Sequence, residues 1–192
     1  MKKGLTEYVF VLDCSESVAG RKAEYINSFN SMIADYIQQD GEGLVTTILF
    51  NQRSKIFHDR INLASVNPII EEDYTISGKT ALLDALGHTI KHISTIQKYA
   101  REEDKPEHTV FVVATDGKED ASKRYTAEEI EKSIQRRKET RNWQFIFTDA
   151  SLETIITACK VKAENAAADT EDENDLTEYI DSLLRIFENR KS

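Results

Sequence analysis

Five oxygen-bearing side chains stand where the predicted strands end or where a predicted helix begins. They are Asp13, Ser15, Ser17, Thr80 and Asp116. Carboxylate and hydroxyl donors, with no nitrogen or sulfur among them, suit a hard divalent cation such as Mg²⁺ or Mn²⁺ and do not suit Zn²⁺. Because three of the five donors are neutral, a bound cation would keep uncompensated charge and would attract a further carboxylate.

The runs that lead to the two carboxylates predict strands buried on both faces. Residues 8–12 and 110–114 are each five consecutive non-polar residues, too short for a helix and rich in β-branched or aromatic side chains. In an open α/β sheet, ligands bind beyond the carboxyl ends of the strands. Asp13 and Asp116 are therefore predicted to meet at one edge of a sheet.

The remaining patterns alternate between helix and strand. Apolar residues step by three and four, as in helices with one buried face, over residues 23–37, 82–96 and 130–134. Further strands are predicted over residues 44–50, 55–63 and 143–147. The short turn before residues 55–63 makes them an antiparallel edge strand. This order predicts an α/β fold: a doubly wound, Rossmann-like, mostly parallel sheet with helices on both faces.

The end of the chain carries weaker patterns. We expect a short helix over 152–159, a weak strand over 161–168, an acidic connector over 169–175 and a last helix over 175–187. The acidic run does not fit a calcium-binding EF-hand loop, because Asn174 stands where glycine is needed and Ile180 where glutamate is needed. We expect residues 1–192 to form a single domain.

Charge and composition limit the class of partner. The net charge is −9, from 25 basic and 34 acidic residues, and no basic stripe is evident, so we expect neither nucleic acid nor an anionic membrane as a partner. No apolar run approaches the length of a membrane span, and the first residues lack a leader pattern, so we expect a cytoplasmic protein. Cys14 and Cys159 stand in unrelated contexts, which excludes a disulfide framework.

The set of motifs resembles the von Willebrand factor type A domain and its metal-ion-dependent adhesion site. The motifs are an apolar strand followed by Asp-x-Ser-x-Ser at 13–17, a threonine at a helix start, and Thr-Asp-Gly at 115–117 after another strand. The run Ser-Gly-Lys-Thr-Ala-Leu-Leu-Asp-Ala-Leu at 77–86 resembles the small stand-alone bacterial members, and this architecture implies a bacterial or phage origin. The resemblance is clearest over residues 5–160.

The resemblance implies a role for each candidate residue. Ser15 and Ser17 would bind the metal directly, and Thr80 would bind it directly or through water. Asp13 and Asp116 would act mainly through water. The last position on the metal would go to a glutamate or aspartate of a partner protein, which in bacterial relatives can be an ATPase or a larger assembly. We therefore expect a protein-binding module and not an enzyme.

Two residues at the candidate site depart from the family pattern. Glu16 stands where relatives usually have glycine, and Lys79 stands where a small residue is usual. Lys79 either weakens metal binding while favouring an acidic ligand, in which case titration calorimetry of Lys79→Gly should show tighter metal binding, or it points to solvent. We expect Glu16 to be a surface charge, not a sixth ligand. Glu119 and Asp120 either add negative charge near the metal or lie in a solvated turn, and we expect the solvated turn.

The main alternative is a phosphatase-like hydrolase with Asp13 as its nucleophile. Haloacid dehalogenase-like phosphatases also place an aspartate after the first strand, but most need a second aspartate two residues later as a general acid. Ser15 stands there, and its hydroxyl cannot deliver a proton at neutral pH. A phosphate-binding loop at residues 78–80 is excluded, because Asp73 stands where the first glycine of that motif is needed.

Overall fold

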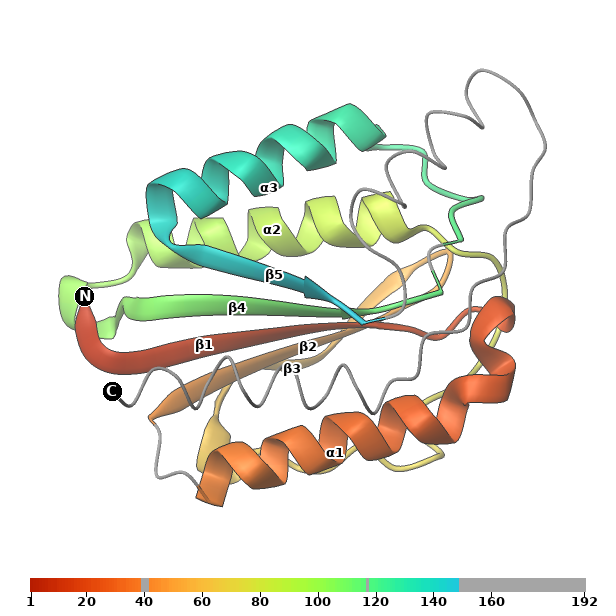
Figure 1. Cartoon of the computed structure of the whole chain (residues 1–192), viewed down its shortest axis with the longest axis horizontal. Coiled ribbons are helices and arrows are strands. Elements are labelled where there is room, and N and C mark those ends of the chain that lie inside the picture. The colour runs from red at the N-terminus through yellow and green to blue at the C-terminus, as the bar shows by residue number, and fades with distance from the viewer. Residues whose placement is uncertain (39–41, 117, 149–192) are drawn as a thin grey trace.

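The computed structural model describes residues 1–38, 42–116 and 118–148, and within them a five-stranded sheet forms the centre of the fold (Figure 1). The strands are β1 (Lys2–Asp13), β2 (Gly43–Phe50), β3 (Ser54–Asn62), β4 (Pro106–Ala114) and β5 (Trp143–Phe147). Their order across the sheet is β3-β2-β1-β4-β5. All neighbouring pairs are parallel except β2 and β3, which are antiparallel.

Helices cover both faces of this sheet. The helix α1 (Lys22–Gln38) lies on one face, and α2 (Leu82–Tyr99) and α3 (Ala127–Arg141) lie together on the other (Figure 1). Short 3₁₀ turns occupy η1 (Glu16–Arg21), η2 (Leu63–Ser65) and η3 (Glu102–Asp104). The predicted α/β fold, with a mostly parallel Rossmann-like sheet and one antiparallel edge strand, is confirmed.

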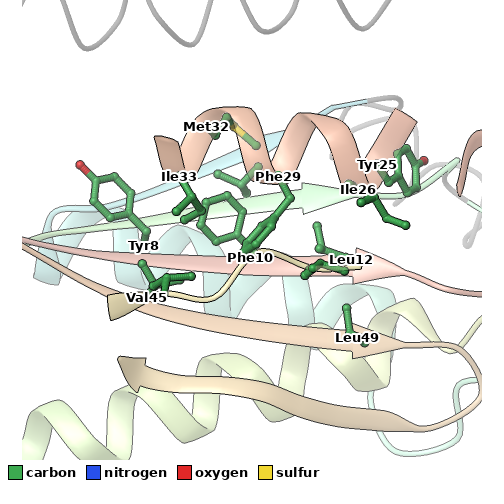
Figure 2. Close-up of a cluster of buried hydrophobic side chains, with 14 of the residues drawn as sticks. Tyr8, Phe10, Leu12, Tyr25, Ile26, Phe29, Met32, Ile33, Val45 and Leu49 are labelled. Carbon is green, nitrogen blue, oxygen red and sulfur yellow. The ribbon is translucent and has the colours of Figure 1, made fainter. Parts of the chain in front are cut away.

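The central strand β1 is buried on both faces, as its apolar run predicts. Phe10 and Leu12 point toward α1, where the rings of Phe10 and Phe29 meet edge to face with centroids 4.9 Å apart (Figure 2). Val9 and Val11 alternate with them and join the second core, beneath α2 and α3. Burying each such side chain stabilises the fold by about 1.5–3 kcal/mol. The strand that ends at the candidate site is thus held by both cores.

The buried stripe of α1 differs from the predicted one. Ala23 and Ile37 are exposed, although the stepping pattern places them on the core face. Tyr25, Met32 and Tyr36 are buried instead. These three lie at i, i+7 and i+11, with Phe29 at i+4 between them, so they form one helical stripe of large side chains. Ala23 and Ile37, the two ends of the predicted face, lie outside this stripe.

The edge strand β3 pairs with β2 irregularly, which explains its loose alternation of apolar and polar residues. The register between the two strands shifts on both sides of Thr47, and Arg60 adopts a positive φ of 50°. Irregularities of this kind change which face the following residues occupy. Ile56 and Ile61 consequently remain exposed on this strand.

The helix α3 begins with the capping box that its sequence predicts. The Thr126 side chain accepts a hydrogen bond from the Glu129 N–H at 3.3 Å, and the Glu129 carboxylate accepts one from the Thr126 N–H at 2.9 Å. In the part of the chain that the structure describes, the helices are all too short or too polar to cross a membrane. The elements expected over 152–187 lie outside the described residues.

Candidate functional site

The carboxyl ends of β1 and β4 lie side by side at one edge of the sheet. Leu12 pairs with Ala114, so the residues that follow them, Asp13 and Thr115, are neighbours. The Thr115 hydroxyl donates a hydrogen bond of 2.8 Å to Asp13 Oδ2. Asp13 Oδ1 accepts a second hydrogen bond of 2.8 Å from the Ser15 N–H. Both oxygens of this carboxylate are therefore held by the chain.

Asp13 has no exposed surface, and its surroundings act on its charge in opposite directions. Burial raises the pKa of the Asp13 carboxyl, while hydrogen bonds from Ser15 and Thr115 lower it. The negative charge of Asp116 is close enough to raise this pKa further. The Tyr74 hydroxyl also donates to the main-chain carbonyl of Asp13. Asp13 is thus a rigid, desolvated carboxyl beside a second carboxylate, a pairing that a cation would stabilise.

Three hydroxyl groups form a hydrogen-bonded row beside this carboxylate. The Thr80 hydroxyl donates to Ser15 Oγ at 2.8 Å, and Ser15 Oγ lies 2.9 Å from Ser17 Oγ. Ser15 and Thr80 are buried, whereas Ser17 is exposed. The row therefore reaches from the interior to the surface and joins the loop after β1 to the segment that precedes α2.

Thr80 is held in place by the loop that follows β4. Its N–H donates to Asp120 Oδ1 at 2.9 Å, and its carbonyl accepts hydrogen bonds of 3.0 Å from the N–H groups of Asp120 and Ala121. The backbone of Thr80 is thus bonded on both sides to a segment about 40 residues further along the chain. This reciprocal contact positions the hydroxyl that belongs to the row.

The same loop caps the start of α2, where Ala81 has no side-chain hydrogen bond to offer. Glu119 Oε2 accepts from the Leu83 N–H at 2.9 Å, and Ser122 Oγ accepts from the Asp84 N–H at 3.0 Å. Free N–H groups at a helix start need such acceptors. Asp120 is exposed in a bend, as expected of a solvated turn, and Glu119 is half-buried. Their carboxylates also accept hydrogen bonds from the backbone at the start of α2, which the sequence did not predict.

Asp116 directly follows Thr115, is close enough to Asp13 to act on its charge, and is half-buried. Its Oδ1 accepts a hydrogen bond of 3.0 Å from the Lys118 N–H. In the described residues there is no group of three or more His, Cys, Asp or Glu side chains that could hold a metal ion. A cation at this edge would therefore depend on the hydroxyls of Ser15, Ser17 and Thr80 as well as on the carboxylates, which is a donor set that fits Mg²⁺ or Mn²⁺.

Comparison with known proteins places this arrangement in a family. The family model of the von Willebrand factor type A domain matches residues 8–181. The chain belongs to this family. Type A domains typically mediate protein interactions, and they commonly bind a divalent metal ion at a metal-ion-dependent adhesion site. A search of curated proteins finds no match.

Solved structures resemble this type A domain at low sequence identity. The manganese-loaded TRAP protein of Plasmodium vivax has a TM-score of 0.56 and 16% identity, over 94% of this chain and 72% of that one. The PilB minor pilin of Streptococcus sanguinis has a TM-score of 0.48 and 18% identity over 58% of this chain, which spans 30% of the pilin. BatB of Bacteroides thetaiotaomicron has a TM-score of 0.43 and 15% identity, over 74% and 65% of the two chains. The likeness to TRAP shows the fold.

The two residues that depart from the family pattern lie on the surface of this type A domain. The Glu16 N–H donates to the Gly78 carbonyl at 3.0 Å, and Glu16 Oε1 accepts from the Gly78 N–H at 3.3 Å. Glu16 therefore joins the two loops beside the hydroxyl row in addition to carrying an exposed charge. Lys79 is exposed, and its N–H donates to Gln52 Oε1 at 3.4 Å.

Several residues that support the site carry no motif of their own. Asn51 is one of them, since its Nδ2 donates to the Ser77 carbonyl at 2.9 Å and its own carbonyl accepts from the Ala81 N–H at 2.9 Å. Tyr74 is another, because its hydroxyl reaches the backbone of Asp13. Thr115, which donates a hydrogen bond to Asp13, is the one of these supporting residues that the sequence indicated, as the first residue of the Thr-Asp-Gly run. The others act across distances in the chain that local patterns do not report.

Proposed function

We propose that this type A domain is a divalent-cation-dependent protein-binding module that recognises an acidic side chain of a partner protein. The observation that carries the proposal is the row of hydrogen-bonded hydroxyls from Thr80 through Ser15 to Ser17, seated beside the buried carboxyl of Asp13. Three oxygens, each within hydrogen-bonding distance of the next, supply the neutral donors that one small cation would need.

Each residue of the proposed site has a separate task. Ser15, Ser17 and Thr80 would supply neutral oxygens, and Asp13 would supply negative charge from beneath them. Asp116, half-buried at the rim, would face the cation from the side of β4. A bound Mg²⁺ or Mn²⁺ would supply the positive charge that attracts the partner's carboxylate. Because Asp13 and Asp116 would act mainly through water, the cation would keep an open position at which a carboxylate of the partner can bind it directly.

The rim of the site is open to a partner. Ser17, Glu16 and Lys79 are all exposed beside the hydroxyl row. The ammonium group of Lys79 favours an approaching carboxylate, and the Glu16 carboxylate opposes it, although Glu16 also accepts a hydrogen bond from Gly78. These two charges offset each other, so attraction of an acidic group would rest on the cation itself.

The hydrolase alternative fits this geometry less well. Asp13 has no exposed surface, and both of its oxygens accept hydrogen bonds, so it is poorly placed to attack a phosphate ester. The Ser15 hydroxyl, in the position of the general acid, is engaged with Thr80 and Ser17. We expect no turnover of p-nitrophenyl phosphate in the presence of Mg²⁺; turnover that Asp13→Asn abolishes would contradict the proposal.

The proposal is tested by titrating Mg²⁺ and Mn²⁺ into the metal-free chain by calorimetry. Ser17→Ala and Asp116→Asn remove two donors at the open side of the site, and each should weaken cation binding by about tenfold or more. Ser65→Ala and Asp104→Asn are matched controls, because both residues are exposed, and they follow β3 and precede β4 at the opposite end of the sheet. The controls should bind as the wild type does.

Two results would contradict the proposal. One is a saturable cation site that all four variants retain with unchanged affinity, since the cation would then lie elsewhere. The other is the absence of cation binding by the wild type both alone and in the presence of acetate at high concentration, which mimics the partner's carboxylate. Circular dichroism of each variant separates lost binding from lost folding.

A further inference from the structure

A groove of about 560 Å³ runs between α2 and α3, on the face of the sheet opposite α1, where the two helices lie side by side (Figure 1). Its lining is strongly basic. The basic residues that line it are Lys91, Lys98, Arg136, Arg137 and Arg141. Glu129 is the one acidic residue of this lining. The sequence predicts no basic stripe, and that prediction is wrong here, because the fold brings together cations from two helices.

In the part of the chain that the structure describes, no ion pair neutralises the cations of this groove. Within residues 1–38, 42–116 and 118–148, none of the five forms an ion pair. The carboxylate of Glu129 is used by the Thr126 N–H in the capping box. The chain as a whole carries a net charge of −9, so this concentration of positive charge runs against the overall balance.

Two buried polar side-chain atoms at the groove have no hydrogen-bond partner among the described residues. Ser94 Oγ and Arg137 Nε are inaccessible to water and have no hydrogen-bond partner in the described part of the chain. A buried polar atom without a partner usually needs an explanation, because leaving it unpaired is costly. The guanidinium of Arg137 lies 5.4 Å from the centroid of the Trp143 ring, which holds it against β5. Burial and the charges of Arg136 and Arg141 lower the pKa of Arg137.

We propose that the groove between α2 and α3 binds an acidic segment of a partner protein. Carboxylates would neutralise the five cations, and the hydroxyls of Ser94 and Ser133 lie in the same lining. Tyr125, which is half-buried, contributes apolar surface to it, and the core residues Ile90 and Ile130 lie beneath. A peptide that mixes acidic and apolar side chains uses both kinds of surface. A nucleic acid would use mainly the cations, and its phosphate chain would meet the acidic remainder of the molecule.

This surface is separate from the proposed cation site. Thr80 precedes the first residue of α2, whereas Lys98 and Arg141 lie in the last turns of α2 and α3, with 18 and 15 residues in the two helices. An 18-residue helix is about 27 Å long, a span that about eight extended residues cover. Binding in the groove is therefore expected to be independent of Mg²⁺ and of chelator.

The test is fluorescence anisotropy of the full chain with a labelled peptide of about six residues, mostly glutamate with two leucines, which spans about 20 Å and so cannot reach the cation site from the far end of the groove. The double variant Arg137→Gln with Arg141→Gln removes two cations from the groove and should weaken peptide binding by about tenfold or more. The matched control is Lys132→Gln with Lys138→Gln, which removes two charges from α3 at residues that do not line the groove. The control should change the affinity by less than about twofold.

Three outcomes would overturn the proposal. Equal weakening by both double variants would mean that the peptide senses only the net charge. Binding that chelator abolishes would place the peptide at the cation site. Tighter binding of a labelled oligothymidylate of similar length than of the peptide would assign the groove to a nucleic acid. Thermal unfolding of each variant confirms that the fold is intact before affinities are compared.

Discussion

Replacing Asp84 by alanine tests how the loop over residues 118–125 is held against the start of α2. Asp84 Oδ1 accepts hydrogen bonds from the N–H groups of Arg124 at 2.8 Å and Tyr125 at 3.0 Å. Its Oδ2 accepts one from the Lys123 N–H at 3.0 Å. Alanine removes all three bonds. Asparagine can keep the first two, because its one oxygen can replace Oδ1, but its amide group would face the Lys123 N–H.

The size of the effect follows from these contacts. A hydrogen bond to a charged group contributes about 1.5–3 kcal/mol, and solvent reduces this to about 1 kcal/mol for bonds that are partly exposed, as these are. Three such bonds give about 3 kcal/mol, and the better helix propensity of alanine offsets about 0.5 kcal/mol. Asp84→Ala should therefore lower the free energy of unfolding by about 2–3 kcal/mol, and Asp84→Asn by about 1 kcal/mol. For a chain of this size, the alanine variant should unfold roughly 5–10 °C lower.

Urea and thermal unfolding, followed by circular dichroism, measure this difference. Glu128→Ala is the matched control, because Glu128 also lies in the first turn of a helix and its only described partner, Lys132, is 3.9 Å away at the surface. The control should stay within about 0.5 kcal/mol of the wild type. The reasoning fails if Asp84→Ala is no less stable than the control. Since the loop also carries Asp120, which accepts from the Thr80 N–H, Asp84→Ala should weaken cation binding too.

Two further substitutions test the packing and the titration of buried groups. A Cβ at Gly87 would lie 2.5 Å from the Tyr125 ring, so Gly87→Ala should destabilise the wild type by about 1 kcal/mol. In a Tyr125→Ala variant the ring is gone, and the same substitution should be stabilising because alanine has the better helix propensity. Calorimetric unfolding of the wild type, the two single variants and the double variant measures both effects. Burial lowers the pKa of His58 from 6.5. Below pH 6.5 the unfolded chain takes up a proton that the folded chain resists, so stability falls as the pH drops, by at most about 1.4 kcal/mol per pH unit, and His58→Gln should remove this part of the dependence in urea unfolding.

The sequence predicts the strands and helices of the described residues because the spacing of apolar residues along each element indicates which positions are buried. The five-residue apolar runs before Asp13 and Thr115 need two covering layers, and β1 and β4 have them. The capping box at Thr126 is equally local, since it joins residues three apart. Where an irregularity interrupts the period, as around Thr47 and Arg60, the pattern weakens and the burial of individual side chains cannot be predicted.

The sequence predicts which residues form the candidate site, but not the contacts that hold them together. Motif spacing identifies Asp13, Ser15 and Thr80, and the structure adds that their oxygens are joined by hydrogen bonds. The sequence does not reveal that Glu119 and Asp120 accept hydrogen bonds near the start of α2, because only the fold shows that this helix start lacks its own cap and lies beside them.

By itself, the sequence determined the α/β class, the antiparallel edge strand and the oxygen-donor residues at strand ends, because each depends on residues close together in the chain. Only the tertiary structure decided that β1 stands between β2 and β4, that the 118–125 loop holds Thr80, and that Lys98 and Arg141 line one groove. These contacts join residues about 40 or more positions apart. Their proximity comes from strand order and helix packing, which local periodicity does not encode.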